Sequence, residues 1–268
     1  MKRFINDITP PFLKRYFKRL ITGTKKYYPQ WIVLEGKYSG GIKMYLDPRT
    51  ELGKTLLHGH DTFMYDQLIQ FPRHSGGIYL DIGAHMGYHT LGFARLAGEN
   101  GKVYAFEPHP FNRERLLLNI HENPELVGRI TVIDKALSHS PGTVTFEMLK
   151  NLEEGVSSAS RLNRESIKTN KPVSYVELIT VEVDTIDRLL ATGKISAPDI
   201  MKIDVEGEEF NVLRGAENAL IQHHPAILVE VHNIENMYRI MQFLPGINYH
   251  VTLINKEADG RCFLYCTC

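Results

Sequence analysis

The chain has 268 residues, of which 43% are hydrophobic and 23% are charged, and its formal net charge at pH 7 is zero. Such values are typical of a soluble globular protein with one large core, and the balanced charge gives no overall attraction to nucleic acid. No apolar run approaches the ~20 residues of a membrane span, and charges and prolines interrupt the N-terminus where a secretion signal would be apolar, so we expect a cytoplasmic protein.

The first thirty residues are strongly basic, with Asp7 as the only acid. Apolar residues recur at helical spacing over residues 11–22, and lysines and arginines occupy the other face. We favour a helix docked on the domain, and the alternative is peripheral contact with the inner membrane surface. Residues 31–48 then predict a β-hairpin turning at residues 39–41. We therefore expect an N-terminal extension over residues 1–50 and a second domain over residues 51–268.

Strands and helices alternate from residue 78 onward. Buried strands are predicted at 78–82, 103–107, 130–133, 200–204 and 226–231, with a further strand at 143–149. Helices are predicted at 89–97, from Pro110 to about residue 120, and from Gly207 to about Ile221. This alternation indicates an α/β fold with a mostly parallel sheet between two layers of helices. Strands at 249–254 and 261–268 predict an antiparallel terminal hairpin, which a plain dinucleotide-binding fold lacks.

Two segments carry no clear chemistry. Residues 151–174 are polar and lack hydrophobic periodicity, so they are either a substrate loop or disordered. All three cysteines lie in the last seven residues, at a spacing that matches no common metal motif. On a strand, Cys262, Cys266 and Cys268 would share one face with Leu264. We expect reduced cysteines that are partly buried, and the alternative is a metal-binding or redox role.

The stretch "YLDIGAHMGYHT" places a glycine turn between a buried strand and a helix. Its pattern D-x-G-x-x-x-G differs from the G-x-G-x-x-G of dinucleotide-binding proteins. Gly83 and Gly87 would let a ligand approach the backbone, and the helix start would attract a carboxylate or a phosphate. S-adenosylmethionine offers a carboxylate and an amino group, and Asp81 could bind the amino group. His85 would line the pocket, and His89 is expected on the face of the helix.

The next two strands supply further candidates for the cofactor. Glu107 follows the second strand and could accept both hydroxyls of a ribose, which S-adenosylmethionine and NAD share. The third strand leads into "IDKALS", beside the expected adenine. Either Asp134 or the backbone near Ala136 could bind that ring.

Acids and a histidine follow the fourth and fifth strands. Asp204 and Glu206 come from "MKIDVEGEE", and Glu230 and His232 from "LVEVHN". The carboxyl ends of parallel strands meet at one edge, which is where open α/β sheets bind ligands. These four side chains could also hold Mg²⁺, which we do not favour. Glu206 could instead cap its own helix, and Glu230 could pair with a lysine or an arginine.

Six ordered motifs between residues 78 and 232 resemble the FkbM family of S-adenosylmethionine-dependent methyltransferases: "DIGAHMGYHT", "AFEPHP", "KALS", "VDTIDRLL", "MKIDVEGEEFNVLRGA" and "PAILVEVH". The resemblance implies a class I methyltransferase fold, a Rossmann-like sheet of seven mostly parallel strands ending in an antiparallel hairpin. Many relatives carry a glutamate before the helix that precedes the first strand, where this chain has Asp61.

The resemblance also implies O-methylation of a hydroxyl on a sugar, glycan or other natural product. That reaction needs a general base, for which Asp204 and His232 compete, with Glu206 as a further catalytic candidate. The rival functions are a nicotinamide-dependent oxidoreductase on a similar sheet and a non-catalytic cofactor-binding protein. The missing third glycine and the terminal hairpin count against the oxidoreductase.

Overall fold

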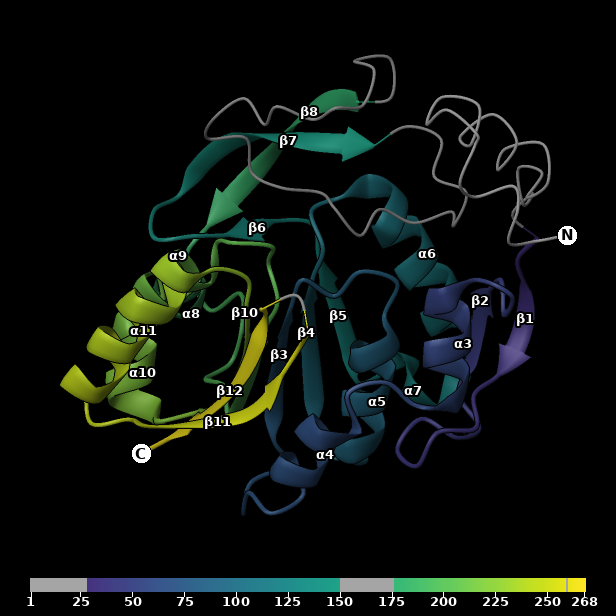
Figure 1. Cartoon of the computed structure of the whole chain (residues 1–268), viewed down its shortest axis with the longest axis horizontal. Helices are drawn as coiled ribbons and strands as arrows, with labels where there is room; N and C mark the ends of the chain where they lie inside the picture. Colours follow the sequence, from purple (N-terminus) through teal and green to yellow (C-terminus); the bar gives the residue numbers. More distant parts are fainter. Residues whose placement is uncertain (1–27, 150–175, 259) are drawn as a thin grey trace, which may run out of the picture.

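A computed structural model describes residues 28–149, 176–258 and 260–268 (Figure 1). The basic helix expected at residues 11–22 and the polar segment 151–174 lie outside the described residues, so their roles stay predictions. The domain boundary at residue 50 and the cytoplasmic location also stay predictions. None of the helices in the described ranges is long and apolar enough to cross a bilayer.

The centre of the fold is a seven-stranded sheet in the order β11-β12-β10-β9-β3-β4-β5. β12 alone runs opposite to the other six strands of this sheet, which confirms the expected mostly parallel sheet with an antiparallel terminal hairpin. The order from one edge to the other is β11 (His250–Lys256), β12 (Cys262–Thr267), β10 (Ala226–Val231), β9 (Ile200–Ile203), β3 (Ile78–Ile82), β4 (Lys102–Phe106) and β5 (Ile130–Ile133).

Helices cover both faces of this sheet because successive residues of each strand point to opposite sides. Tyr79 and Ala105 pack into one core, and Leu80 and Phe106 pack into the other. The first core is closed by α3 (Glu51–His58), α4 (Thr62–Leu68), α5 (Tyr88–Leu96), α6 (Pro110–His121) and α7 (Pro124–Val127). The second is closed by α8 (Ile186–Ala191), α9 (Glu209–Arg214), α10 (Glu217–His223) and α11 (Ile234–Gly246).

Two elements differ from the sequence prediction. The strand expected at 143–149 exists as β7 (Gly142–Leu149), but it pairs with β8 (Val176–Asp184) in a separate sheet, β6-β8-β7, with β6 at Ala136–Leu137. Exposed Thr143 and Thr145 alternate with Val144, a pattern that suits an antiparallel strand with one face in water. The single helix expected to run to Ile221 is instead α9 and α10, separated at Gly215, where a Cβ would lie 2.1 Å from the carbonyl oxygen of Ser138.

The hairpin predicted near residues 31–48 is confirmed as β1 (Gln30–Val33) and β2 (Lys43–Leu46). Asn119 accepts a hydrogen bond from the Tyr45 amide at 2.8 Å and donates one to the carbonyl of Met86 at 2.9 Å. Asn123 accepts from the Lys43 amide at 3.0 Å and donates to the Lys43 carbonyl at 2.9 Å. Two side-chain amides thus take the place of a neighbouring strand along β2, and one of them also reaches the glycine turn.

Cys262 and Cys266 lie on β12 as expected, whereas Cys268 follows the strand and is exposed, so the expectation of burial is wrong for that residue. Leu264 and Cys266 are buried in the second core, Cys262 packs against them, and Cys268 is exposed at the strand end. All three cysteines are free thiols. Burial raises the pKa of the Cys266 thiol to about 12, so this thiol is unreactive near neutral pH.

Candidate active site

The turn between β3 and α5 folds over the end of β4. The amides of Gly83 and Ala84 both donate to the carbonyl of Phe106, at 3.1 and 3.0 Å. Gly83 and Gly87 have φ angles of +83° and +92°, in the left-handed region that favours glycine. Gly87 precedes α5 without a side-chain cap, so the amides at the helix start stay available to an anionic group.

Substituting Gly83 by alanine is expected to destabilise the protein by about 3 kcal/mol. A Cβ there would lie 1.9 Å from the backbone oxygen of Asp204, and the residue would keep a positive φ angle. The matched control is Gly128→Ala, because no atom lies within 4 Å of that Cβ and φ is −64°. Thermal melts of both variants test the expectation. Equal melting temperatures would mean that the turn does not pack against β9 in this way.

Glu107 lies directly after β4, on the cavity wall, and is only 5% exposed. Its Oε2 accepts the amide of His85 at 2.7 Å, and its Oε1 accepts the amide of His109 at 2.9 Å. Burial raises the pKa of Glu107 to about 7, although these two amides oppose the shift. Each carboxylate oxygen keeps a further lone pair, so the group can still accept hydroxyl donors.

Asp81 lies beneath the turn and does not line the cavity. It is fully buried, and its Oδ2 accepts the hydroxyl of Thr90 at 2.5 Å. Its partner in the strand register is Lys202, whose ammonium lies 3.4 Å from Asp81 Oδ1. Asp81 thus contacts Lys202 and Thr90, and its direct contact with the amino group of the cofactor stays a prediction.

Lys202 is a site residue that the sequence analysis missed. It lines the cavity at 4% exposure, lies 3.4 Å from Asp204 Oδ2 and donates to the carbonyl of Gly83 at 3.0 Å. Burial alone would lower the pKa of Lys202, but Asp204 and Asp81 outweigh it and raise the pKa. The available signal was a lysine inside an apolar strand, since a buried charge needs a partner. Lys202 joins the glycine turn to the acids after β9.

Of the two candidates for binding the adenine, the structure places only one on the cavity. Ala136 and Leu137 line the cavity, whereas Asp134 is exposed and is not among the lining residues. The chain turns after β5 to form β6, which takes Asp134 away from the cavity. The backbone near Ala136 is therefore the better placed of the two candidates.

His232 stands at the centre of a group of acids after β9 and β10. Its Nδ1 lies 2.8 Å from Glu209 Oε1, and its Nε2 lies 3.7 Å from Asp204 and 3.8 Å from both Glu206 and Glu230. Burial would lower the pKa of His232, but Glu209 and then Asp204 and Glu206 outweigh it and raise the pKa to about 9. The imidazole is therefore protonated at neutral pH in the absence of a ligand.

Glu209 was also missed by the sequence analysis. It is fully buried, accepts the amide of Gly207 at 2.7 Å, and bonds Asn236 through its other oxygen. A carboxylate held in this way fixes the orientation of the His232 ring. The sequence indication for it was the third acid in "VEGEE", three residues after Glu206 and the first residue of α9.

The acids around His232 differ in their ionisation. Burial alone would raise the pKa of Asp204, but Lys202 and His232 outweigh it and lower the pKa below its ordinary value. Burial and the charge of Asp204 raise the pKa of Glu230 to about 7. Glu230 pairs with Arg261, as one alternative expected. Glu206 is not the N-cap of α9, which is Glu208, and it has a positive φ of 53°.

A second group of titratable residues lies on the same cavity. Asp61 precedes α4, and its Oδ2 lies 3.0 Å from Nε2 of His60 and 3.5 Å from Nε2 of His89. Burial lowers the pKa of His60. Burial alone would raise the pKa of Asp61, but the two histidines outweigh it and lower the pKa. His89, expected on the helix face, is mostly buried and lines the cavity.

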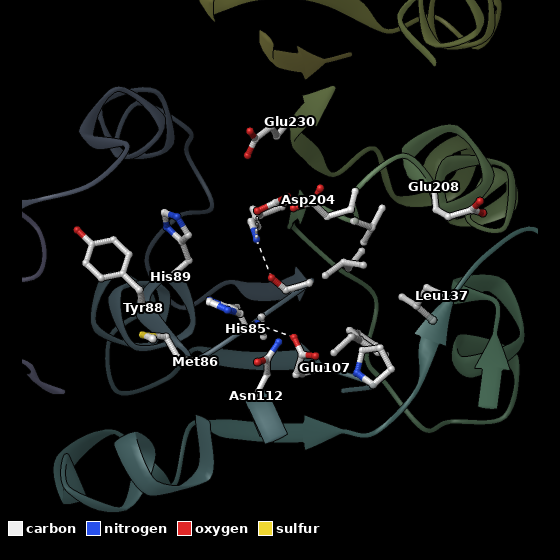
Figure 2. Close-up of a pocket in the computed structure, with 18 of the residues that line it drawn as sticks. His85, Met86, Tyr88, His89, Glu107, Asn112, Leu137, Asp204, Glu208 and Glu230 are labelled. Carbon is white, nitrogen blue, oxygen red and sulfur yellow. Dashed lines mark hydrogen bonds and ion pairs between the residues drawn. The ribbon is translucent and has the colours of Figure 1, made fainter. Parts of the chain in front are cut away.

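These residues surround one cavity of about 300 Å³, a size suited to a small cofactor or substrate. Figure 2 shows Glu107 and Asn112 at one end, Glu230 at the other with Asp204 between them, and His89 opposite Leu137. The donors fit S-adenosylmethionine. A carboxylate suits the ribose, an open helix start suits the methionine carboxylate, and apolar Phe106 and Leu137 suit the adenine.

Comparison with known proteins identifies the family. The model of the methyltransferase FkbM domain matches residues 81–251, well over half of the chain. The chain belongs to the FkbM methyltransferase family. Residues 81–251 therefore form an S-adenosylmethionine-dependent methyltransferase domain of the FkbM type, which counts against the nicotinamide-dependent oxidoreductase.

Two curated relatives show the extent of the similarity. The chain is 28% identical to hexuronic acid methyltransferase AglP of Haloferax volcanii over 181 residues, which are 67% of this chain and 66% of AglP. It is 27% identical to 31-O-demethyl-FK506 methyltransferase FkbM of Streptomyces tacrolimicus over 229 residues, 74% of this chain and 86% of that protein. The chain thus spans just under two thirds of AglP.

A solved FkbM structure shares the fold. The crystal structure of methyltransferase FkbM from Methylobacillus flagellatus superimposes with a TM-score of 0.52 at 19% identity. The match covers 71% of this chain and 43% of that one. At this identity the likeness supports the FkbM fold and leaves the acceptor open.

Proposed function

We propose that the protein transfers the methyl group of S-adenosylmethionine to a hydroxyl of a sugar or another natural-product acceptor. The names of the two curated relatives, a hexuronic acid methyltransferase and a 31-O-demethyl-FK506 methyltransferase, support this class of acceptor. The main structural support is that Asp204 and His232 line the same cavity as Gly83 and Glu107. Candidates for proton transfer and for cofactor binding therefore share one enclosed space.

On this proposal, the turn between Gly83 and Gly87, including His85, surrounds the methionine end of the cofactor. Glu107 accepts the ribose hydroxyls, and the backbone at Ala136 borders the adenine. Asp81 acts indirectly, because it holds Lys202, which in turn holds the carbonyl of Gly83. S-adenosylmethionine, when bound, supplies an electrophilic methyl group.

The protein must then align the acceptor hydroxyl and remove its proton. Base catalysis contributes typically ~10²–10⁴-fold, and alignment of the reacting atoms contributes further. We propose His232 as the base, since Nε2 faces the cavity while Glu209 stabilises the imidazolium that forms. To act, His232 must first lose the proton it carries at neutral pH. Asp204 would then stabilise the protonated ring at 3.7 Å.

The magnesium alternative at Asp204, Glu206, Glu230 and His232 is less consistent with the charges around it. Lys202 lies 3.4 Å from Asp204, and Arg261 pairs with Glu230. A divalent ion would have to displace or tolerate both cations. We therefore favour proton transfer without an ion among these four residues.

A binding measurement tests the cofactor site. Calorimetric titration is expected to show S-adenosylhomocysteine binding to the wild type and no binding of NAD. Glu107→Gln should weaken that binding at least ~10-fold, equivalent to ~1.4 kcal/mol, because the ribose loses a charged acceptor. Glu125→Gln, an exposed acid on α7, is the matched control. Equal affinities in both variants would remove Glu107 from the cofactor site.

A product analysis tests the acceptor class. The protein is incubated with labelled S-adenosylmethionine and with either a hexuronic acid glycoside or the corresponding neutral hexoside. Transfer to a hydroxyl gives a methyl ether that withstands mild alkali, and transfer to a carboxylate gives an ester that does not. A base-stable product supports the proposal. An alkali-labile product formed only from the hexuronic acid would mean that the acceptor atom is a carboxylate oxygen.

A further inference from the structure

The strongest unassigned feature is the group of His60, Asp61 and His89. One ring nitrogen of each histidine and one carboxylate oxygen of Asp61 lie within 4.8 Å of one another. All three side chains line the cavity. They come from the loop before α4 and from the first turn of α5, so two separate segments converge there. The proposed methyl transfer uses none of them.

The separations match those between neighbouring ligands of one metal ion. With metal–donor distances of about 2.1 Å, adjacent donors lie about 3.0 Å apart in octahedral and about 3.4 Å apart in tetrahedral geometry. Asp61 Oδ2 lies 3.0 Å from His60 Nε2 and 3.5 Å from His89 Nε2. The carboxylate is thus at ligand spacing from both histidines, and the two imidazoles each bring a ring nitrogen within 4.8 Å of the other.

The surrounding residues orient these donors. The hydroxyl of Tyr65 lies 3.1 Å from Nδ1 of His89, which leaves Nε2 directed at Asp61. Tyr65 is 2% exposed and stacks on the His89 ring, so the ring has little freedom. A polar partner on the distal nitrogen is the usual way in which a protein orients a histidine ligand.

The backbone also presents Asp61 to the cavity. Asp61 is the N-cap residue of α4, yet its side chain makes no capping hydrogen bond, and its φ angle is +50°. A non-glycine residue in this region is uncommon and often marks a functional position. The hydroxyl of Tyr88 holds the neighbouring amide, accepting from His60 N at 2.8 Å. The carboxylate is therefore turned toward the two histidines instead of toward its own helix.

We propose that His60, Asp61 and His89 bind a divalent transition-metal ion, for which Zn²⁺ and Mn²⁺ are suitable candidates. Two imidazoles and one carboxylate form a ligand set that such ions favour and that leaves coordination positions open. The open positions would face the cavity, where an oxygen of the acceptor could bind. This use of the ion rests on the proposed function, whereas binding of the ion does not.

The charge environment favours this group over Asp204, Glu230 and His232, whose ligand atoms also lie within 4.8 Å of one another. Lys202 and Arg261 already pair with the acids of that second group. The ion pairs recorded for Asp61 within the described ranges are those with His60 and His89. A metal ion at Asp61 therefore displaces no lysine or arginine.

Calorimetric titration with Zn²⁺ tests the proposal, using full-length protein from which a chelator has first removed bound metal. One ion per chain is expected to bind, and His89→Ala and Asp61→Asn should each raise the Kd at least ~10-fold. Co²⁺ should give the visible absorption of a bound ion, which both variants lose. Asp61→Asn keeps the shape of the side chain, so it still tests the proposal if His89→Ala does not fold.

Two controls locate the ion. His58→Ala removes an exposed histidine next to the site and should leave the Kd unchanged, as should His232→Ala. Loss of binding in His232→Ala alone would place the ion at the second group and overturn the proposal, as would absence of binding in the wild type. S-adenosylhomocysteine titration of the same samples reports on the cofactor site separately, so failure of the methyl-transfer proposal would be seen independently.

Discussion

Replacing Lys202 by methionine is expected to lower the melting temperature by roughly 10 °C and to weaken S-adenosylhomocysteine binding at least ~10-fold. The substitution leaves Asp81, which is fully buried, without its cationic partner, and breaking a buried pair costs about 3–5 kcal/mol. For a chain of this size each kcal/mol shifts the melting temperature by about 2–4 °C. The turn also loses its bond from the ammonium to the carbonyl of Gly83.

A double substitution separates charge from packing. In Lys202→Met combined with Asp81→Asn the uncompensated charge disappears, so stability should recover in part and the two effects should be non-additive. Lys54→Met is the matched control, since its pair with Glu51 is exposed and should contribute little. Additive effects in the double variant would show that Lys202 and Asp81 are not coupled.

His232 is expected to titrate near pH 9 in the ligand-free protein, well above the ~6.5 of an ordinary histidine. The measurement is an NMR titration of the histidine ring protons, with His232→Gln used for assignment. Glu209→Gln should lower this pKa, because it removes the carboxylate that lies 2.8 Å from Nδ1. Asp204→Asn should lower it by less, because that acid lies 3.7 Å from Nε2. A wild-type value near 6.5 would contradict this account of the site.

The raised pKa of His232 also makes the stability of the protein depend on pH. Its folded-state pKa is raised, so its stabilising contribution is complete below about pH 6.5 and is lost as the pH rises through about 9. Thermal melts of the wild type should therefore decline over this interval more than those of His232→Gln. If His232 is the base, turnover should rise with pH over the same interval. A rate that stays flat from pH 6 to 9 would favour Asp204.

The sequence predicted those parts of the site that follow from strand order. Gly83, Glu107, Asp204 and His232 each follow a parallel strand, and the carboxyl ends of such strands meet at one edge. The pairing of Lys202 with Asp81 needed the register between β9 and β3, strands separated by more than a hundred residues. Hydrophobic patterns do not specify such a register.

Other features depend on how non-adjacent elements pack. Glu209 reaches His232 only because α9 places its first turn beside the end of β10. His60 and His89 meet through a loop whose course has no periodic signal. Asp134 and Ala136 share the same alternation, yet only Ala136 lines the cavity, because β6 pairs with β8 and does not continue β5.

The two asparagines that bind β2 have a practical implication for protein engineering. The family match begins at residue 81, but Asn119 joins the Tyr45 amide to the carbonyl of Met86, within the glycine turn. In a protein truncated to the matched segment, the Asn119 side chain would lose its partner on β2. The apolar surface of the first core that Leu34 and Met44 cover would become exposed to water. The smallest unit that preserves the cofactor turn therefore begins no later than Leu34, which lies 47 residues upstream of the matched segment (81 − 34).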